Sequence, residues 1–119
     1  MRCKNDSSPS IRNENPSRVM NVYWLFAERK QGKYPSHSEN GGKWLIFLPM
    51  TQIDNMWSKI KSATEEGKLG DLAKVATAKP NSNAADSKTK VICVYTYDWA
   101  DKEDVMHVRE ELRRFVDRA

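Results

Sequence analysis

The segment Lys43–Leu48 (K-W-L-I-F-L) constrains the fold more than any other part of the chain. Apolar side chains occupy both sets of alternating positions: Trp44, Ile46 and Leu48 in one set, Leu45 and Phe47 in the other. This pattern is typical of a strand that is covered on both faces, and it predicts a central strand of a sheet. Pro49 is expected to end the strand because proline has no N–H to donate.

A helix is expected directly after this strand. Thr51 is a suitable N-cap residue, and Gly67 is suited to the helix C-terminus. Between them, apolar residues recur at helical spacing: Ile53, Met56, Trp57 and Ile60. The sequence therefore predicts a helix from Thr51 to about Glu66, with Trp57 in the core.

Two further strands and a second helix follow. The strands are expected at Leu72–Thr77 and at Val91–Tyr97, the second of which is rich in β-branched and aromatic residues. Asp101 caps the last helix. The buried stripe of this helix is expected to contain Val105, Val108, Leu112, Phe115 and Val116. Helix capping accounts for the acidic residues at its start, so we expect no metal site and no cofactor.

The order strand–helix–strand–strand–helix predicts an α+β fold. We expect a small, mostly antiparallel sheet with both helices packed on one face, and a possible edge strand at Val22–Phe26. The other face then needs a cover or a ligand. Residues 1–21 are polar and poor in aliphatic side chains, so they are expected to be a disordered tail. Residues 22–119 are expected to form the single domain.

The net charge and the cysteine content indicate which binding partners and which cellular compartment to expect. The chain of 119 residues has a net charge of +4, but residues 1–42 contain seven Lys/Arg against four Asp/Glu. The charge of the domain is therefore nearly balanced, which is weak support for a nucleic-acid partner. The only cysteines are Cys3 and Cys93, which favours a reducing compartment, cytoplasmic or nuclear. No apolar run is long enough to span a bilayer, so no membrane partner is expected.

Three blocks of sequence resemble a known family of uncharacterised proteins. They are Gly42–Leu48 (G-K-W-L-I-F-L), Gly67–Ala76 (G-K-L-G-D-L-A-K-V-A) and Val91–Trp99 (V-I-C-V-Y-T-Y-D-W). From about Tyr23 onwards the chain resembles the basophilic leukaemia-expressed protein family. The resemblance implies a fold like that of the mRNA-cap-binding translation initiation factor, a curved antiparallel sheet backed by helices. Relatives continue with a segment rich in Lys, Thr, Asp and Gly, so the resemblance also implies that this domain lacks that segment.

A more distant resemblance, to bacterial phosphothreonine lyases, implies a catalytic alternative. Lys74 matches the lysine that acts as the general base in those enzymes. The position of their acid histidine matches Leu45, which cannot transfer a proton, and His37 and His107 lie elsewhere in the sequence. We therefore favour binding over catalysis. The residue pattern alone also allows Lys74 to be a lysine that extends from the sheet into solvent.

The first functional hypothesis is a binding module for an anionic ligand on the uncovered sheet face. The ligand would be a nucleotide, an RNA or a phosphorylated peptide on a phosphoprotein. Lys43, Lys74 and Lys90 would supply positive charge, and Trp24 or Trp99 would supply stacking. The alternatives are a phosphothreonine lyase-like enzyme that uses Lys74 as the base, and a protein–protein adaptor.

Overall fold

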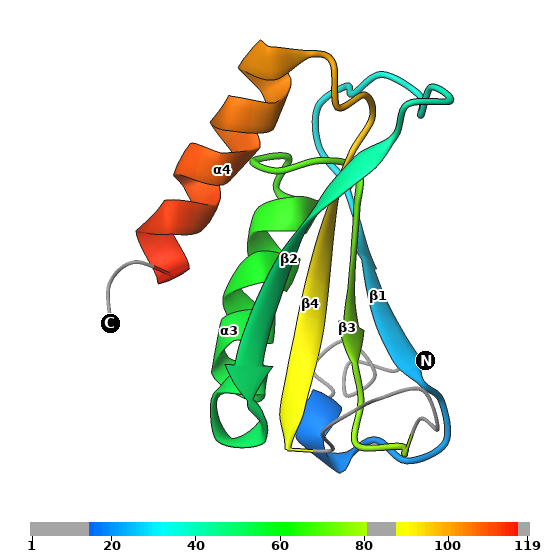
Figure 1. The fold of residues 1–119 in the computed structure, drawn as a ribbon, viewed down its shortest axis with the longest axis vertical. Helices are drawn as coiled ribbons and strands as arrows, with labels where there is room; N and C mark the ends of the chain where they lie inside the picture. The colour runs from blue at the N-terminus through cyan, green and yellow to red at the C-terminus, as the bar shows by residue number, and fades with distance from the viewer. Residues whose placement is uncertain (1–14, 81–87, 117–119) are drawn as a thin grey trace.

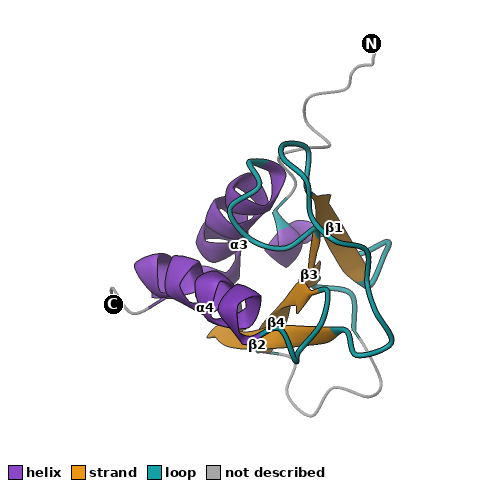
Figure 2. Ribbon diagram, turned by 90° about the horizontal axis from the view of Figure 1, so that it is seen from above, coloured by secondary structure: helices purple, strands orange, loops and turns teal. Residues whose placement is uncertain are grey.

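One curved, four-stranded antiparallel sheet organises the molecule (Figure 1). The computed structural model describes residues 15–80 and 88–116. In chain order, the elements after a short 3₁₀ turn are β1 (Trp24–Glu28), β2 (Gly42–Pro49), α3 (Met50–Glu65), β3 (Leu72–Ala76), β4 (Thr89–Thr96) and α4 (Lys102–Val116). The spatial order of the strands is β1-β3-β4-β2. Both helices lie on one face of the sheet, which confirms the predicted α+β architecture (Figure 2).

The long strand β2 lies at an edge of the sheet, so its prediction as a central strand covered on both faces was wrong. It pairs with β4 along its whole length and has no strand on its other side among the described residues. Ile46 is half-buried beneath the helices, whereas Leu45 and Phe47 point to the opposite face and are exposed. The second apolar face of β2 therefore remains uncovered.

The core lies between the helices and the sheet. Ile53, Trp57 and Ile60 of α3 are fully or almost fully buried against Val75 of β3 and Ile92 of β4. Burying side chains of this size stabilises the fold by about 1.5–3 kcal/mol each. The helix α3 begins at Met50 with Pro49 as its N-cap residue, so the predicted cap at Thr51 lies within the helix. Gly67 has a φ of 82° just after the helix, as its predicted place at the C-terminus requires.

The helix α4 packs against α3 and the β4 end of the sheet. The Asp101 carboxylate accepts a hydrogen bond from the Asp104 backbone N–H, which confirms Asp101 as the cap. Val108 and Leu112 are buried. The indole N–H of Trp44 donates to the Val105 carbonyl and so joins β2 to this helix. No helix in residues 15–80 and 88–116 is long and apolar enough to span a membrane.

Ordered contacts begin before residue 22, at which the sequence placed the start of the domain. Pro16–Arg18 form a 3₁₀ turn, and Pro16 is buried. The Ser17 backbone N–H and hydroxyl both donate to the carboxylate of Asp54 on α3. Part of the predicted tail is thus fastened to the helix layer, while the predicted disorder of residues 1–14 concerns positions outside the described residues.

Candidate functional site

The sheet face opposite the helices carries an unusual set of side chains, and we call it the open face. Aromatic, apolar and cationic residues from all four strands point to it: Trp24 and Phe26 of β1, Lys74 of β3, Val91, Cys93 and Tyr95 of β4, and Lys43, Leu45 and Phe47 of β2. Phe26 is 56% exposed, Leu45 48% and Phe47 64%. The open face therefore carries large exposed apolar side chains at both of its edges, on β1 and on β2.

Lys74 lies near the centre of the open face. Its ammonium nitrogen is 4.0 Å from the centroid of the Trp24 ring, a distance at which a cation is attracted to the electron-rich face of an indole. Phe26 on β1 and Cys93 on β4 are its direct cross-strand partners. The lysine therefore lies along the sheet surface, flanked by rings, and stays within reach of a ligand.

A second lysine and ring occupy the β2–β4 side of the open face. The ammonium nitrogen of Lys43 is 5.8 Å from the centroid of the Tyr95 ring, directly across the strand pair. Cys93 lies between the two lysines and is 3% exposed. Burial raises the pKa of the Cys93 thiol, although the charges of Lys43 and Lys74 partly offset this increase. The thiol is therefore protonated at neutral pH and is not an activated nucleophile.

The five residues proposed from the sequence do not all meet. Lys43, Lys74 and Trp24 lie on the open face. Lys90 alternates to the helix side of β4, where it pairs across the strands with Leu48 and is only 6% exposed. Trp99 is 64% exposed in the turn before α4, and its backbone N–H donates to the Asn40 carbonyl.

The structure adds aromatic and apolar residues to the site that the sequence did not single out. Phe26, Leu45, Phe47 and Tyr95 surround the two lysines. A further cation–ring pair lies just beyond the sheet, where the Lys79 ammonium is 4.4 Å from the Tyr23 ring centroid. Alternation along β2 indicated that Leu45 and Phe47 share a face, but it could not show that this face is uncovered.

The environment of Lys74 differs from that of a general base with an acid partner. Its neighbours across both strand pairs are Phe26 and Cys93, and Leu45 follows next in the same row. His37 lies at the end of the open face, where its Nε2 is 3.4 Å from Asp71 Oδ1 and its ring is 6.1 Å from that of Tyr95. In the row of residues that contains Lys74, the only side chain with an acidic proton is the Cys93 thiol, which is a weak acid. This row therefore lacks an effective general acid beside Lys74.

The loop between β1 and β2 is fixed at this same end of the molecule. Tyr34 donates a hydrogen bond from its hydroxyl to Asp104 of α4 (2.5 Å), and the same hydroxyl accepts one from the Tyr97 backbone N–H. Burial, followed by the Asp104 hydrogen bond, raises the pKa of Tyr34. Arg29 stacks on the Tyr34 ring at 4.8 Å and donates to the Leu69 carbonyl. These contacts give the open face a rigid border.

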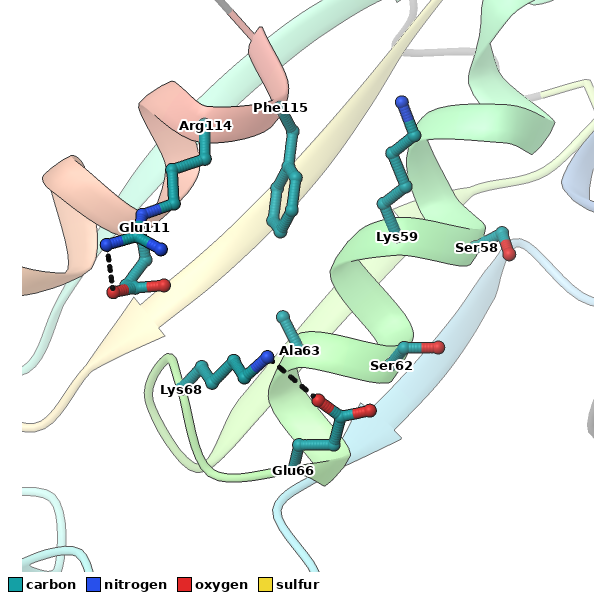
Figure 3. A pocket seen from close by; sticks show the side chains of 9 residues that line it. All are labelled: Ser58, Lys59, Ser62, Ala63, Glu66, Lys68, Glu111, Arg114 and Phe115. Atoms are coloured by element: carbon teal, nitrogen blue, oxygen red, sulfur yellow. Dashed lines mark ion pairs between the residues drawn. The ribbon is translucent and has the colours of Figure 1, made fainter.

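A separate hollow of about 410 Å³ lies in the helix layer, between α3 and α4 (Figure 3). Phe115 points from α4 towards α3 and, with Ala63, supplies apolar surface. Lys68 pairs with Glu66 at 3.1 Å and Arg114 with Glu111 at 3.7 Å, so much of the charge around this hollow is neutralised. The two lysines on the open face have no such acidic partners among the described residues, which makes the sheet the stronger candidate site.

The arrangement of the elements defines a small α+β protein in which one layer of helices covers one face of an antiparallel sheet. The family model of basophilic leukemia-expressed protein Bles03 matches residues 38–116. The chain belongs to this family. The matched region runs from before β2 to the end of α4, so it includes Lys43 and Lys74 but not Trp24 and Phe26 on β1.

Proposed function

We propose that this protein is a non-enzymatic binding module whose open face takes a single-stranded RNA. The observation that carries the proposal is the pairing of each lysine on this face with an aromatic ring, Lys74 with Trp24 and Lys43 with Tyr95. An RNA strand offers bases that stack on rings and phosphates that bind ammonium groups, so it matches both halves of each pair.

The exposed rings account for most of the expected affinity. Stacking of a base on an aromatic side chain contributes about 1–3 kcal/mol per base. Phe26 and Phe47 present more than half of their surface to solvent at opposite edges of the open face, and neither has a polar group that would read a base edge. We therefore expect binding that tolerates many sequences, in a protein located where RNA is found, in the cytoplasm or nucleus.

The charge on the open face favours RNA over a phosphorylated peptide. Phosphate groups on proteins are usually held by clusters of arginine that bind two oxygens at once. Here the cations are single lysines set among rings. A free nucleotide has the same base and phosphate groups as RNA, so its binding is measured separately.

Fluorescence anisotropy with labelled oligouridine and oligoadenosine tests the proposal. We expect binding that weakens at least fivefold in Phe26→Ala and in Lys74→Gln. The matched control is Lys59→Gln, which removes one exposed lysine from α3 on the other side of the molecule and should bind like the unaltered protein. Equal affinity of all three variants, or tighter binding of a phosphothreonine peptide than of RNA, contradicts the proposal.

The same exposed side chains support an adaptor as the second candidate. Phe26, Leu45 and Phe47 would suit a protein partner without any anionic group. Salt separates the two candidates, because RNA binding weakens as salt rises whereas apolar docking does not. The lyase alternative predicts dehydrobutyrine in a phosphothreonine peptide, and mass spectrometry after prolonged incubation with the protein checks it.

A further inference from the structure

A chain of contacts joins the β1–β2 loop to the end of the open face. His37 belongs to this loop, and its Nε2 atom is 3.4 Å from Oδ1 of Asp71, the residue just before β3. The centroid of the His37 ring is 6.1 Å from that of Tyr95, and the Lys43 ammonium is 5.8 Å from the same Tyr95 centroid. The histidine and its carboxylate partner therefore lie next to one of the two lysine–ring pairs of the proposed RNA site.

One oxygen of the Asp71 carboxylate lacks a hydrogen bond. Within residues 15–80 and 88–116, Oδ1 of Asp71 is the buried side-chain polar atom that has no hydrogen-bond partner. Leaving a buried carboxylate oxygen unbonded costs free energy, so this oxygen favours a donor beside it. Among the same residues, His37 is the ion-pairing partner that the structure places within 4.0 Å of Asp71.

Protonation decides how His37 meets this oxygen. A neutral imidazole carries one proton, on either ring nitrogen, whereas the protonated ring carries a proton on both nitrogens and a positive charge. The other nitrogen, Nδ1, packs against the backbone of Gly41, where an added Cβ atom would lie 2.7 Å from it. The ring is thus held with Nε2 towards Asp71, and its protonated form supplies both the missing donor and the opposite charge.

The net charge at this end of the open face therefore depends on pH. Histidine side chains ordinarily change charge between about pH 5 and 8, whereas carboxylates titrate near about pH 4. With a neutral His37, the negative charge of Asp71 is uncompensated and repels phosphate groups beside Lys43. With a protonated His37, the two charges cancel. Around the ring, Tyr95 of β4 separates His37 from Lys43 of β2, and Glu39 on the same loop is exposed to solvent, which screens its charge.

We infer that His37 regulates RNA binding on the open face according to pH, because its protonation cancels the charge of Asp71 and so strengthens the binding. This inference rests on the RNA-binding function proposed above and adds a regulating residue to the same site. The effect should be modest, since the two side chains are 37% and 38% exposed and water screens their charges. We expect a gain in affinity of about threefold from about pH 7.5 to about pH 5.5 at low salt.

Fluorescence anisotropy with an oligouridine that has no terminal phosphate is the test, because uracil and the phosphodiester groups keep their charge in this range. His37→Gln should bind at both pH values as weakly as the unaltered protein binds at the higher one. The matched control is His107→Gln, which removes the other histidine of the chain, exposed on α4. This control variant should keep the full pH effect.

The variant Asp71→Asn tests the other half of the pair. It removes the opposing charge, so its affinity at the higher pH should rise to the level that the unaltered protein reaches at the lower pH. Melting curves at both pH values verify that the variants fold. Equal affinity of the unaltered protein at the two pH values overturns the inference but leaves RNA binding standing, and so does a pH effect that persists in His37→Gln. Absence of RNA binding at both pH values overturns the proposed function and this inference with it.

Discussion

Lys74 and Trp24 are diagonal neighbours across the β1–β3 pair, and the lysine ammonium lies 4.0 Å from the centroid of the indole ring. The contact places a positive charge and the largest aromatic side chain of the edge strand at one point on the sheet. It also joins the edge strand to its neighbour through side chains, in addition to the backbone hydrogen bonds.

Replacing the ring should therefore change stability. We expect Trp24→Leu to lower the free energy of unfolding by about 0.5–1 kcal/mol, since it keeps apolar bulk but loses the attraction between cation and ring. Trp24→Phe, which retains an aromatic face, should lie between this variant and the unaltered protein. Urea denaturation followed by circular dichroism measures the difference. Equal stability of the leucine and phenylalanine variants would show that the cation–ring attraction contributes nothing.

The two lysines on the open face should determine the salt dependence of RNA binding. Each phosphate neutralised on a single strand contributes about −0.7 to the slope of log K against log salt, so two contacts give about −1.4. Lys43→Gln and Lys74→Gln should each reduce the steepness by about 0.7. Anisotropy titrations at several salt concentrations provide the slopes. An unchanged slope in either variant would remove that lysine from the set of phosphate contacts.

Gly70 should tolerate no side chain. A Cβ atom at this position would lie 2.0 Å from the Tyr95 carbonyl oxygen, which belongs to the backbone of β4 and cannot rotate away. We expect Gly70→Ala to destabilise the protein by more than about 2 kcal/mol, as overpacking at rigid sites does. Gly42→Ala is the milder comparison, because its Cβ would meet the Trp99 Cβ at 3.2 Å. Thermal melts of the two variants should differ clearly, and similar melting temperatures would contradict the expectation.

The pair Tyr97 and Asp101 should make stability depend on pH at both extremes. The Tyr97 hydroxyl donates to the Asp101 carboxylate, which raises the pKa of Tyr97 to about 12 and lowers the pKa of Asp101. A lowered carboxylate pKa stabilises the fold above its unfolded value, and this contribution disappears as the pH falls through the folded pKa. A raised tyrosine pKa stabilises the fold below about pH 10, and that contribution is lost as the pH rises towards about 12.

The variant Tyr97→Phe removes the hydroxyl and tests both effects. Its melting temperature should vary less with pH than that of the unaltered protein, in the acid range and again between about pH 10 and about pH 12. Melting curves in a series of buffers provide the comparison. Parallel pH profiles for the two proteins would mean that this hydrogen bond does not link folding to protonation.

Ile60 should be among the most sensitive core positions. It is fully buried on α3, and Ile→Ala at such sites typically costs about 2–5 kcal/mol because a cavity remains. Lys59→Ala, at the preceding exposed position of the same helix, should change stability by less than about 0.5 kcal/mol. Urea denaturation of both variants checks the contrast. A small effect at Ile60 would show that the core refills the space.

The sequence predicted the helices and strands well because each has a local cause. Helical spacing placed Trp57 and Ile60 on one stripe, and Asp101 supplied a cap that the structure confirms. The sheet order could not be predicted in the same way. A strand that is apolar on both sides looks identical whether its second face is buried in the core or left exposed, so the edge position of β2 needed the structure.

The site was predicted only in part for a related reason. Lys43 and Lys74 reach the same face only through the register that links β2, β4 and β3, which no local pattern encodes. Lys90 lies on the opposite face of the sheet from these two lysines. Because β4 is apolar at both sets of alternating positions, the sequence could not show to which face Lys90 points. Trp24 became part of the site through its contact across the sheet with Lys74.

The buried thiol of Cys93 offers a chemical probe of the open face. It points to the open face beside Lys74 and Leu45 and is 3% exposed, so a thiol reagent can reach it only when the side chains around it move aside. In a Cys3→Ser background, the rate of alkylation would therefore report how often the side chains over Cys93 move aside. A ligand that lies over these side chains would slow that rate without touching the sulfur, so the alkylation rate would measure how much of the open face is occupied.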